Sequence, residues 1–308
     1  MSLPYLGPQD LRRALPMKDA IEALDNVFSG ALPSAPPRSH LDVGRGDLLV
    51  MPAWGEDLGV GVKLVTVAPA NPSSGLPLIH GIYVLFDYEA LRPLALLDGA
   101  ALTGIRTAAV SAVATRYLAR DKSKTLLVFG GGTQGQAHIE AMGEVLPELE
   151  QVLCVSRSGP SAERLVKKAN ELGHRAQVAS ADAVEQADVI CTCTTASSAL
   201  FDGALIQSGT HVNAVGAYKP DARELDDATI TRSSVFVEVK EPALREAGDL
   251  RIPIESGVLV ASDVTELGDV AAGRAVGRAD DEQLTVFKSV GVAFEDLVVA
   301  GAAVKRFA

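Results

Sequence analysis

Three glycines near the middle of the chain, Gly130, Gly132 and Gly135, have the spacing G-x-G-x-x-G. In this arrangement the first glycine permits a tight turn, the second lets backbone N–H groups approach a pyrophosphate, and the third lets a helix pack close to a strand. Thr133 and Gln134 lie between the last two glycines, where a helix N-terminus would offer free N–H groups and the positive end of its dipole. These residues could hold the phosphates of a dinucleotide.

The residues on both sides of this glycine loop distinguish a cofactor site from an ordinary turn. Residues 126–129 form an apolar run typical of a buried strand, and residues 137–142 continue as a helix. The motif is informative when a strand precedes it and a helix follows. We therefore expect dinucleotide binding here, which limits the chemistry that the chain can perform.

The end of the next predicted strand indicates which dinucleotide is bound. An NAD-preferring site usually has Asp or Glu there to accept hydrogen bonds from the ribose hydroxyls, but this chain has Ser156, Arg157 and Ser158. These side chains offer hydrogen-bond donors and a positive charge to a 2′-phosphate. They favour NADP(H), with NAD(H) as the alternative if Arg157 is a solvated loop residue or stacks on the adenine of either cofactor.

A lysine, Lys63, interrupts an otherwise apolar predicted strand and shares a face with Val65 and Val67. Such a lysine lies either on an exposed sheet face, which the pattern alone favours, or in a cleft. Partial burial would lower its pKa and make proton transfer feasible near neutral pH.

Arg106 follows Thr103, a residue that can cap a helix running to about Ala119. A cation in the first turn of a helix opposes the helix dipole. Either an anion such as a substrate carboxylate binds between the arginine and the helix end, or Arg106 forms a salt bridge with a nearby acid. Arg38 is a loop arginine whose position alone indicates nothing.

The elements that must position these residues change in character near residue 120. Residues 47–97 contain four strand-like runs, which predict an antiparallel meander. From Lys124 onward strands and helices alternate, which predicts βαβ units and a doubly wound parallel sheet. The strands expected there are 126–129, 152–155, 176–179, 189–194, 211–215 and 235–239, and the helices include 161–172 and 181–187.

The last segment, residues 281–305, has helical spacing, and we expect it to return to the first domain because a Rossmann domain is complete without it. The predicted fold class is α/β, with a Rossmann-type doubly wound parallel sheet and an α+β amino-terminal domain that the carboxyl-terminal helix completes. The expected domains are residues 1–119 plus 281–308 and residues 120–280.

Composition excludes several classes of partner. A chain of 308 residues suggests about two domains. Its net charge of −11 argues against nucleic acid and anionic membrane surfaces as main partners. No apolar run approaches the roughly 20 residues of a membrane span, and the N-terminus lacks the pattern of a signal peptide.

The three cysteines, Cys154, Cys191 and Cys193, lie in apolar, strand-like runs. A C-x-C pair with no nearby histidine pair is a poor zinc site, so we expect no metal. Buried, reduced thiols are the favoured interpretation, and they indicate a cytoplasmic location.

Several runs, spread in order over nearly the whole chain, resemble the ornithine cyclodeaminase/μ-crystallin family. They are Pro37-Arg38, Gly61-Val62-Lys63-Leu64-Val65-Thr66-Val67, Leu96-Leu97-Asp98-Gly99, Leu102-Thr103-Gly104-Ile105-Arg106-Thr107-Ala108-Ala109, the glycine loop, Asn213-Ala214-Val215-Gly216-Ala217, Phe287-Lys288-Ser289-Val290-Gly291 and Glu295-Asp296-Leu297.

The resemblance implies a homodimer whose first domain, 1–119 plus 281–308, binds the substrate and dimerises, while 120–280 binds NAD(P). Carried over by motif, Arg38, Lys63 and Arg106 would surround the substrate carboxylate and the reacting carbon. Lys63 would also donate or accept a proton.

The resemblance also assigns cofactor contacts to Thr107 and Ser289. Thr194 and Thr195 end a predicted strand at the carboxyl edge of the sheet, where ligands bind in this architecture, and Val215 and Gly216 do likewise. The latter four residues are therefore further candidates for cofactor binding.

One position departs from the cyclodeaminases, which carry an aspartate two residues after the glycine of the Asn-Ala-Val-Gly run. This chain has Tyr218 there, and tyrosine is a poor base at neutral pH because its unperturbed pKa is about 10. Asp221 lies three residues further on and is a weaker candidate for the catalytic role. The continuation Pro-Asp-x-Arg-Glu-Leu is similar to the reductase branch and to μ-crystallin.

We therefore expect an NAD(P)H-dependent reductase of a small cyclic α-imino acid, of the ketimine or Δ1-pyrroline-2-carboxylate type, that gives an L-imino acid such as proline. Ornithine cyclodeamination and alanine dehydrogenation are the alternatives within enzymes. A μ-crystallin-like protein that binds NADPH without chemistry is the alternative outside them.

Overall fold

Two compact units make up the chain, one from residues 1–106 and 291–308 and the other from residues 107–290. The computed structural model describes residues 3–307, with the side chain of Pro72 excepted. Both boundaries differ from those that the sequence predicts, since the first falls inside a helix, α3 (Gly99–Leu118), and the second follows a strand.

The first unit contains a six-stranded sheet in the order β1-β6-β5-β4-β3-β2. Strands β2 to β6 are antiparallel neighbours, which confirms the predicted meander, and β1 pairs with β6 in parallel. The elements are β1 (Tyr5–Leu6), α1 (Pro8–Ala14), α2 (Met17–Phe28), β2 (Ser39–Asp42), β3 (Asp47–Gly55), β4 (Gly59–Val67), a 3₁₀ turn (Asn71–Ser74), β5 (Ile79–Phe86), β6 (Pro93–Asp98) and α10 (Ala293–Phe307).

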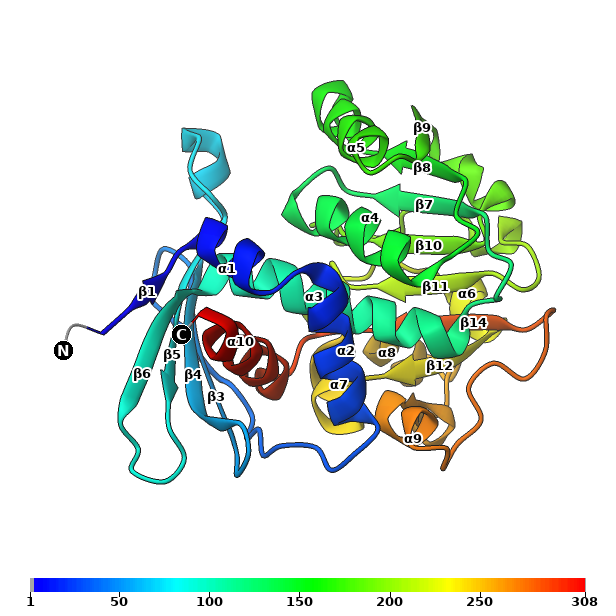
Figure 1. Cartoon of the computed structure of the whole chain (residues 1–308). Coiled ribbons are helices and arrows are strands. Elements are labelled where there is room, and N and C mark those ends of the chain that lie inside the picture. Colours follow the sequence, from blue (N-terminus) through cyan, green and yellow to red (C-terminus); the bar gives the residue numbers. More distant parts are fainter. Residues whose placement is uncertain (1–2, 308) are drawn as a thin grey trace. The chain divides into compact units, whose positions relative to one another are not determined.

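One face of this sheet is the core face of the unit. Helix α10 packs across β3, β4 and β5 and against α2 (Figure 1). Phe28 of α2 meets Phe294 of α10 edge to face, with ring centroids 5.5 Å apart. Along β4 the residues alternate strictly, so that Lys63, Val65 and Val67 are buried on the α10 side while Leu64 and Thr66 are exposed.

The second unit contains an eight-stranded, wholly parallel sheet in the order β13-β12-β14-β11-β10-β7-β8-β9. The strand order reverses between β7 and β10, which confirms the predicted doubly wound topology. Helices α4 and α5 pack on β7, β8 and β9 (Figure 1). The elements are β7 (Thr125–Phe129), α4 (Thr133–Val145), β8 (Gln151–Val155), α5 (Gly159–Glu171), β9 (Arg175–Val178), β10 (Val189–Thr192), β11 (His211–Ala214), α6 (Asp227–Thr231), β12 (Ser233–Val237), α7 (Lys240–Glu246), α8 (Gly248–Glu255), β13 (Thr265–Glu266), α9 (Leu267–Ala271) and β14 (Leu284–Lys288), with 3₁₀ turns at Ala181–Gln186, Gly203–Leu205 and Ala261–Asp263.

Two predicted elements are wrong in detail. The segment 281–305 is not one helix, because Leu284–Lys288 is a fully buried strand between β11 and β12 and only Ala293–Phe307 is helical. A short apolar run fits either period, so periodicity could not separate them. The predicted helix at 181–187 is a 3₁₀ turn.

Thr103 does not cap its helix. Helix α3 begins at Gly99, where Asp98 Oδ1 accepts a hydrogen bond from the backbone N–H of Ala101 (2.8 Å). Thr103 lies one turn inside and donates its hydroxyl to the carbonyl of Gly99 (2.7 Å). Asp98 was the better capping residue, since Asp is among the strongest N-caps. Within residues 3–307, no helix is both long enough and apolar enough to cross a membrane.

Candidate active site

Lys63 lies on the buried face of β4 and is only 1% exposed, so the exposed position that the pattern favoured is wrong. Its ammonium donates to Asp296 Oδ2 (2.7 Å) and to Thr103 Oγ1 (3.2 Å). Burial lowers the pKa of Lys63 to about 8, an effect that Asp296 opposes and Arg106 reinforces. A lysine with such a pKa can exchange a proton near neutral pH.

Arg106 is the eighth residue of α3, well beyond its first turn, so the predicted conflict with the helix dipole does not arise. Its Nη1 lies 2.8 Å from Glu295 Oε2, and its Nε lies 3.5 Å from Asp296 Oδ1. Arg106 therefore forms salt bridges, one of the two roles expected from the sequence, with acids 189 and 190 positions later in the chain (295 − 106 and 296 − 106).

The two acids lie in the first turn of α10, where the helix dipole stabilises negative charge. The preceding loop brings the helix close to the guanidinium. Gly291 has φ +78°, and a Cβ there would lie 2.3 Å from Nη1 of Arg106. Only glycine fits both this backbone conformation and this approach. We name the set Lys63, Arg106, Glu295 and Asp296 the ionic cluster.

Two further side chains of the first unit bear on this cluster. Tyr83 is paired with Lys63 across β4 and β5 and is buried on the same face. Burial, and secondarily Asp296, raises the pKa of Tyr83 well above its usual value, so the phenol stays neutral. Arg38 is half-buried in the loop immediately before β2.

The glycine loop of the second unit has the geometry that its motif predicts. Gly130 has φ +106°, and a Cβ there would lie 2.4 Å from the carbonyl oxygen of Cys193. A Cβ on Gly135 would lie 1.9 Å from the carbonyl oxygen of Gly130, so the helix and strand pack too closely for a side chain. Gly132 caps α4 and has no atom within 4 Å of where its Cβ would be.

This open space at Gly132 fits a pyrophosphate. The backbone N–H groups at the start of α4, including those of Thr133 and Gln134, lie at the positive end of the helix dipole. The structure thus shows a tight turn at the first glycine, close packing at the third and unobstructed backbone at the second, as phosphate binding requires.

The loop after β8 carries the residues expected to distinguish the two dinucleotides. Ser156 is half-buried and Arg157 exposed, while Ser158 occupies the N-cap position of α5 without a side-chain capping hydrogen bond. Ser158 Oγ donates to Ser161 Oγ (2.8 Å), and Arg164 Nη2 donates to the same oxygen (2.7 Å). Arg164 adds a second cation that the sequence pattern did not single out, because it lies inside α5, nine residues after the end of β8.

At the ends of β10 and β11 one buried carboxylate organises the backbone. Glu224 accepts hydrogen bonds from the hydroxyl of Thr192 (2.8 Å), from the N–H (2.8 Å) and hydroxyl (2.7 Å) of Thr194, and from the N–H groups of Gly216 (2.7 Å) and Ala217 (3.3 Å). It thereby fixes two of the predicted cofactor-binding positions.

A second carboxylate supports the first. Asp249 Oδ1 accepts from the N–H groups of Glu224 (2.7 Å) and Leu225 (2.9 Å), and its Oδ2 lies 2.9 Å from Lys288 Nζ. Lys288 ends β14, directly before Ser289. We name Glu224, Asp249 and Lys288 the strand-edge network. Glu224 and Lys288 lie in runs that carry the resemblance, but no residue pattern indicated these contacts, because most partners in the network are backbone groups.

The remaining predicted residues also lie in the second unit. Thr107 and Ser289 are buried, Thr195 is exposed, and Val215 donates its N–H to the carbonyl of Thr192 (3.0 Å). Asp221 is exposed in the loop between β11 and α6.

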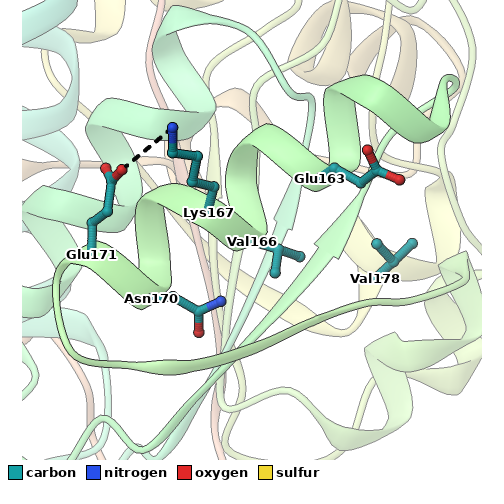
Figure 2. A pocket seen from close by; sticks show the side chains of 6 residues that line it. All are labelled: Glu163, Val166, Lys167, Asn170, Glu171 and Val178. Atoms are coloured by element: carbon teal, nitrogen blue, oxygen red, sulfur yellow. Dashed lines mark ion pairs between the residues drawn. The ribbon is translucent and has the colours of Figure 1, made fainter.

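A surface hollow lies apart from all predicted site residues. Figure 2 shows its lining on α5 and β9, with an ion pair between Lys167 and Glu171 (3.8 Å). Glu163, Val166, Asn170 and Val178 complete it. None of these side chains offers an activated group, so we assign it no chemistry.

The cysteines form no disulfides, and burial raises the pKa of Cys154 and of Cys191 to about 12. Both therefore stay protonated and unreactive. Across residues 3–307, no group of three or more His, Cys, Asp or Glu side chains is arranged to hold a metal ion.

Known proteins resemble this chain over nearly its whole length. It is 43% identical over 281 residues to a Δ1-pyrroline-2-carboxylate reductase of Bacillus cereus, covering 89% of this chain and 86% of the relative. The structure of Δ1-pyrroline-2-carboxylate reductase from Thermococcus litoralis, in complex with NADH and L-proline, superposes with a TM-score of 0.95 at 35% identity, covering 99% and 97% of the two chains.

An archaeal alanine dehydrogenase dimer with bound NAD has a TM-score of 0.93 at 30% identity, covering 99% of this chain and 96% of that chain. The model of the ornithine cyclodeaminase/mu-crystallin family matches residues 10–306. On this evidence, which confirms the likeness seen in the sequence, the chain belongs to the ornithine cyclodeaminase/mu-crystallin family.

Proposed function

We propose that the chain is an NAD(P)H-dependent reductase of a small cyclic α-imino acid, such as Δ1-pyrroline-2-carboxylate, and that it forms an L-imino acid such as proline. The observation that carries this proposal is the buried pair of cations, Lys63 and Arg106, in a chain 43% identical to a reductase of that substrate. An ammonium and a guanidinium together suit a carboxylate.

The side chains of the ionic cluster have different roles toward the substrate. Arg106 binds the carboxylate, with Arg38 as a further cation of the same unit. Lys63 uses two of its three N–H groups on Asp296 and Thr103, which leaves one for the ligand. With its lowered pKa, Lys63 can supply or take a proton at the ring nitrogen. A bound NAD(P)H would supply the hydride that reduces the C=N bond.

We propose NADP(H) as the preferred cofactor, with NAD(H) also accepted. Arg157, Ser158 and Arg164 surround the start of α5 with donors and two positive charges, which support binding of a 2′-phosphate. Arg157→Ala should weaken NADPH binding about tenfold relative to NADH, because one charge contact is lost. Equal losses for both cofactors would count against a phosphate contact.

We also propose a homodimer formed through the outer face of the first unit's sheet. That face carries apolar side chains that are at least 37% exposed, including Trp54 and Leu64. The alanine dehydrogenase relative is a dimer, which supports a second copy as the occupant. Light scattering should give twice the 32.1 kDa chain mass, and Leu64→Asp should lower the measured mass.

The cysteines support a cytoplasmic location, because the thiols of Cys154 and Cys191 are free and buried.

The enzymatic proposal is tested by NADPH and NADH oxidation with Δ1-pyrroline-2-carboxylate, together with chromatographic detection of proline. Wild type should form one proline per cofactor oxidised, and Lys63→Ala should lose at least about 100-fold in kcat because the proton-transfer group is gone. Lys305→Ala, at an exposed lysine of α10, is the matched control.

Three other assays separate the alternatives within the family. Pyruvate with ammonia tests alanine dehydrogenase activity, ornithine with NAD tests cyclodeamination through ammonia release, and NADPH binding without turnover would indicate a non-catalytic protein. No proline from wild type, or full turnover by Lys63→Ala, would overturn the reductase assignment.

A further inference from the structure

Without a ligand, the four side chains of the ionic cluster are buried and their formal charges sum to zero. Lys63 is 1% exposed and Arg106 6%, while Glu295 and Asp296 are fully buried. Two cations thus face two carboxylates, and each cation is within 2.8 Å of a carboxylate oxygen. The charged groups that act on Lys63 are Asp296, Arg106 and Glu295, all members of this set.

Buried charge is costly unless it is compensated, so the net charge of the set matters. A ligand that brings only a carboxylate would add a negative charge to this set, and Arg38, the further cation proposed for the ligand, lies outside the set and is only half-buried. A ligand that brings a carboxylate and a cationic nitrogen leaves it neutral. A protonated cyclic imine with an α-carboxylate has both charges, one on the ring nitrogen and one on the carboxylate of the neighbouring ring carbon.

Asp296 contacts both cations of the ionic cluster. Its Oδ2 accepts from Lys63 and its Oδ1 lies 3.5 Å from Nε of Arg106, so it lies between the two cations. Glu295 Oε2 accepts from Nη1 of Arg106 (2.8 Å). Asp296 therefore fixes the distance between the two cations as well as their charge balance.

We infer that Asp296 and Glu295 are positioning residues that make the site select zwitterionic ring acids over anionic ones. The inference rests on the proposed function, because it takes Lys63 and Arg106 as the groups that meet the ligand carboxylate. It adds that the acids of α10 determine which charge state of the ligand is accepted. Neither acid needs to touch the substrate for this effect.

The test compares two ligands of one shape and different charge. L-Proline is a zwitterion, whereas cyclopentanecarboxylate has the same ring and carboxylate without the nitrogen. Calorimetric affinities are measured with the full-length protein in the presence of NADPH, for wild type, Asp296→Asn and Glu295→Gln. Asp19→Asn, which removes the exposed ion pair of α2 and α10, is the control.

Wild type should bind proline at least about tenfold more tightly than the anion, which corresponds to about 1.4 kcal/mol. Asp296→Asn removes one negative charge with little change of shape, so this ratio should fall at least about tenfold. Glu295→Gln should lower it in the same direction, and the control should leave it unchanged.

A purely structural role for Asp296 would weaken both ligands alike and leave the ratio as in wild type, which would overturn the inference. If Asp296→Asn does not fold, the same criterion applied to Glu295→Gln decides. Because the readout is binding, it is independent of turnover. An inactive wild type would count against the proposed reductase, and the ligand ratio would still decide the charge selection.

Discussion

In each unit of the molecule one pair of buried carboxylates organises its neighbours, but the two pairs bind different kinds of group. In the first unit, Glu295 and Asp296 of α10 face the side-chain cations Lys63 and Arg106. In the second, Glu224 and Asp249 accept mainly from backbone N–H groups and hydroxyls at the strand ends. One arrangement fixes charges, and the other fixes the shape of the backbone.

From this difference we expect the two units to bind different ligands. Charges at fixed distances suit recognition of a small charged substrate. A rigid backbone edge suits a large cofactor that approaches the carboxyl ends of parallel strands. Substitutions in the ionic cluster should therefore affect the imino acid, and substitutions in the strand-edge network should affect the cofactor.

The largest expected effect lies in the ionic cluster. Arg106→Leu should lower kcat/KM for Δ1-pyrroline-2-carboxylate roughly 1,000-fold, about 4 kcal/mol, because it removes the carboxylate contact and leaves Glu295 without its cation. Cofactor affinity, measured by fluorescence titration, should stay within about twofold of wild type. Arg13→Leu, at an exposed ion pair of the same unit, is the control. A comparable loss of cofactor affinity would remove the distinction between the units.

Glu224→Gln should have the next largest effect, and on the cofactor. The amide keeps one acceptor oxygen but turns an NH₂ group toward N–H donors, which should weaken NADPH binding about 30-fold, about 2 kcal/mol. Glu241→Gln, at the exposed pair with Arg245, is the control. Binding of ADP-ribose, which lacks the nicotinamide, should change far less, because the glycine loop is untouched. Equal losses for both ligands would mean that Glu224 supports the unit as a whole.

Substitutions in the glycine loop should have smaller effects, which distinguish cofactor affinity from stability. Gly132→Ala places a methyl group in open space, so the free energy of unfolding should change by less than about 1 kcal/mol while NADPH affinity falls about tenfold. Gly135→Ala places it 1.9 Å from a carbonyl oxygen and should cost about 2–3 kcal/mol of stability. Urea unfolding and cofactor titration of both variants measure this. Normal cofactor affinity in Gly132→Ala would exclude a phosphate at that point.

The smallest expected effect is a pH dependence that belongs to the first unit alone. Burial lowers the pKa of Lys63 to about 8, so its ammonium form is lost as pH rises through that value. Between pH 7 and 8.5, kcat/KM for the imino acid should fall about fourfold. Asp296 holds this pKa up, so in Asp296→Asn the fall should begin at lower pH. An unshifted profile in Asp296→Asn would assign the titration to another group.

Features that depend on interactions between residues close together in the sequence could be predicted, and features that depend on distant residues could not. The glycine loop, the alternation of strands and helices after residue 124 and the meander before it are local patterns, and the structure confirms them. Phosphate binding by a loop depends on neighbours within a few residues. The glycine spacing together with the flanking strand and helix therefore sufficed to predict the shape of the loop at Gly130, Gly132 and Gly135.

The ionic cluster could not be predicted in the same way. Lys63 is buried because α10, more than 200 residues later, covers its face of the sheet, and the partner of Arg106 lies on the same helix. The pattern therefore favoured the wrong face for Lys63 and left a cleft position as the alternative, and the resemblance was needed to favour a site role. Glu224 was missed because its partners are mainly backbone groups, which leave no residue pattern.

The most direct test of the account is a crystal structure of the protein with NADPH and L-proline. We expect the proline carboxylate about 3 Å from Nζ of Lys63 and from the guanidinium of Arg106, with Asp296 still bonded to Lys63. A carboxylate bound away from both cations would contradict the assignment of the ionic cluster as the substrate site.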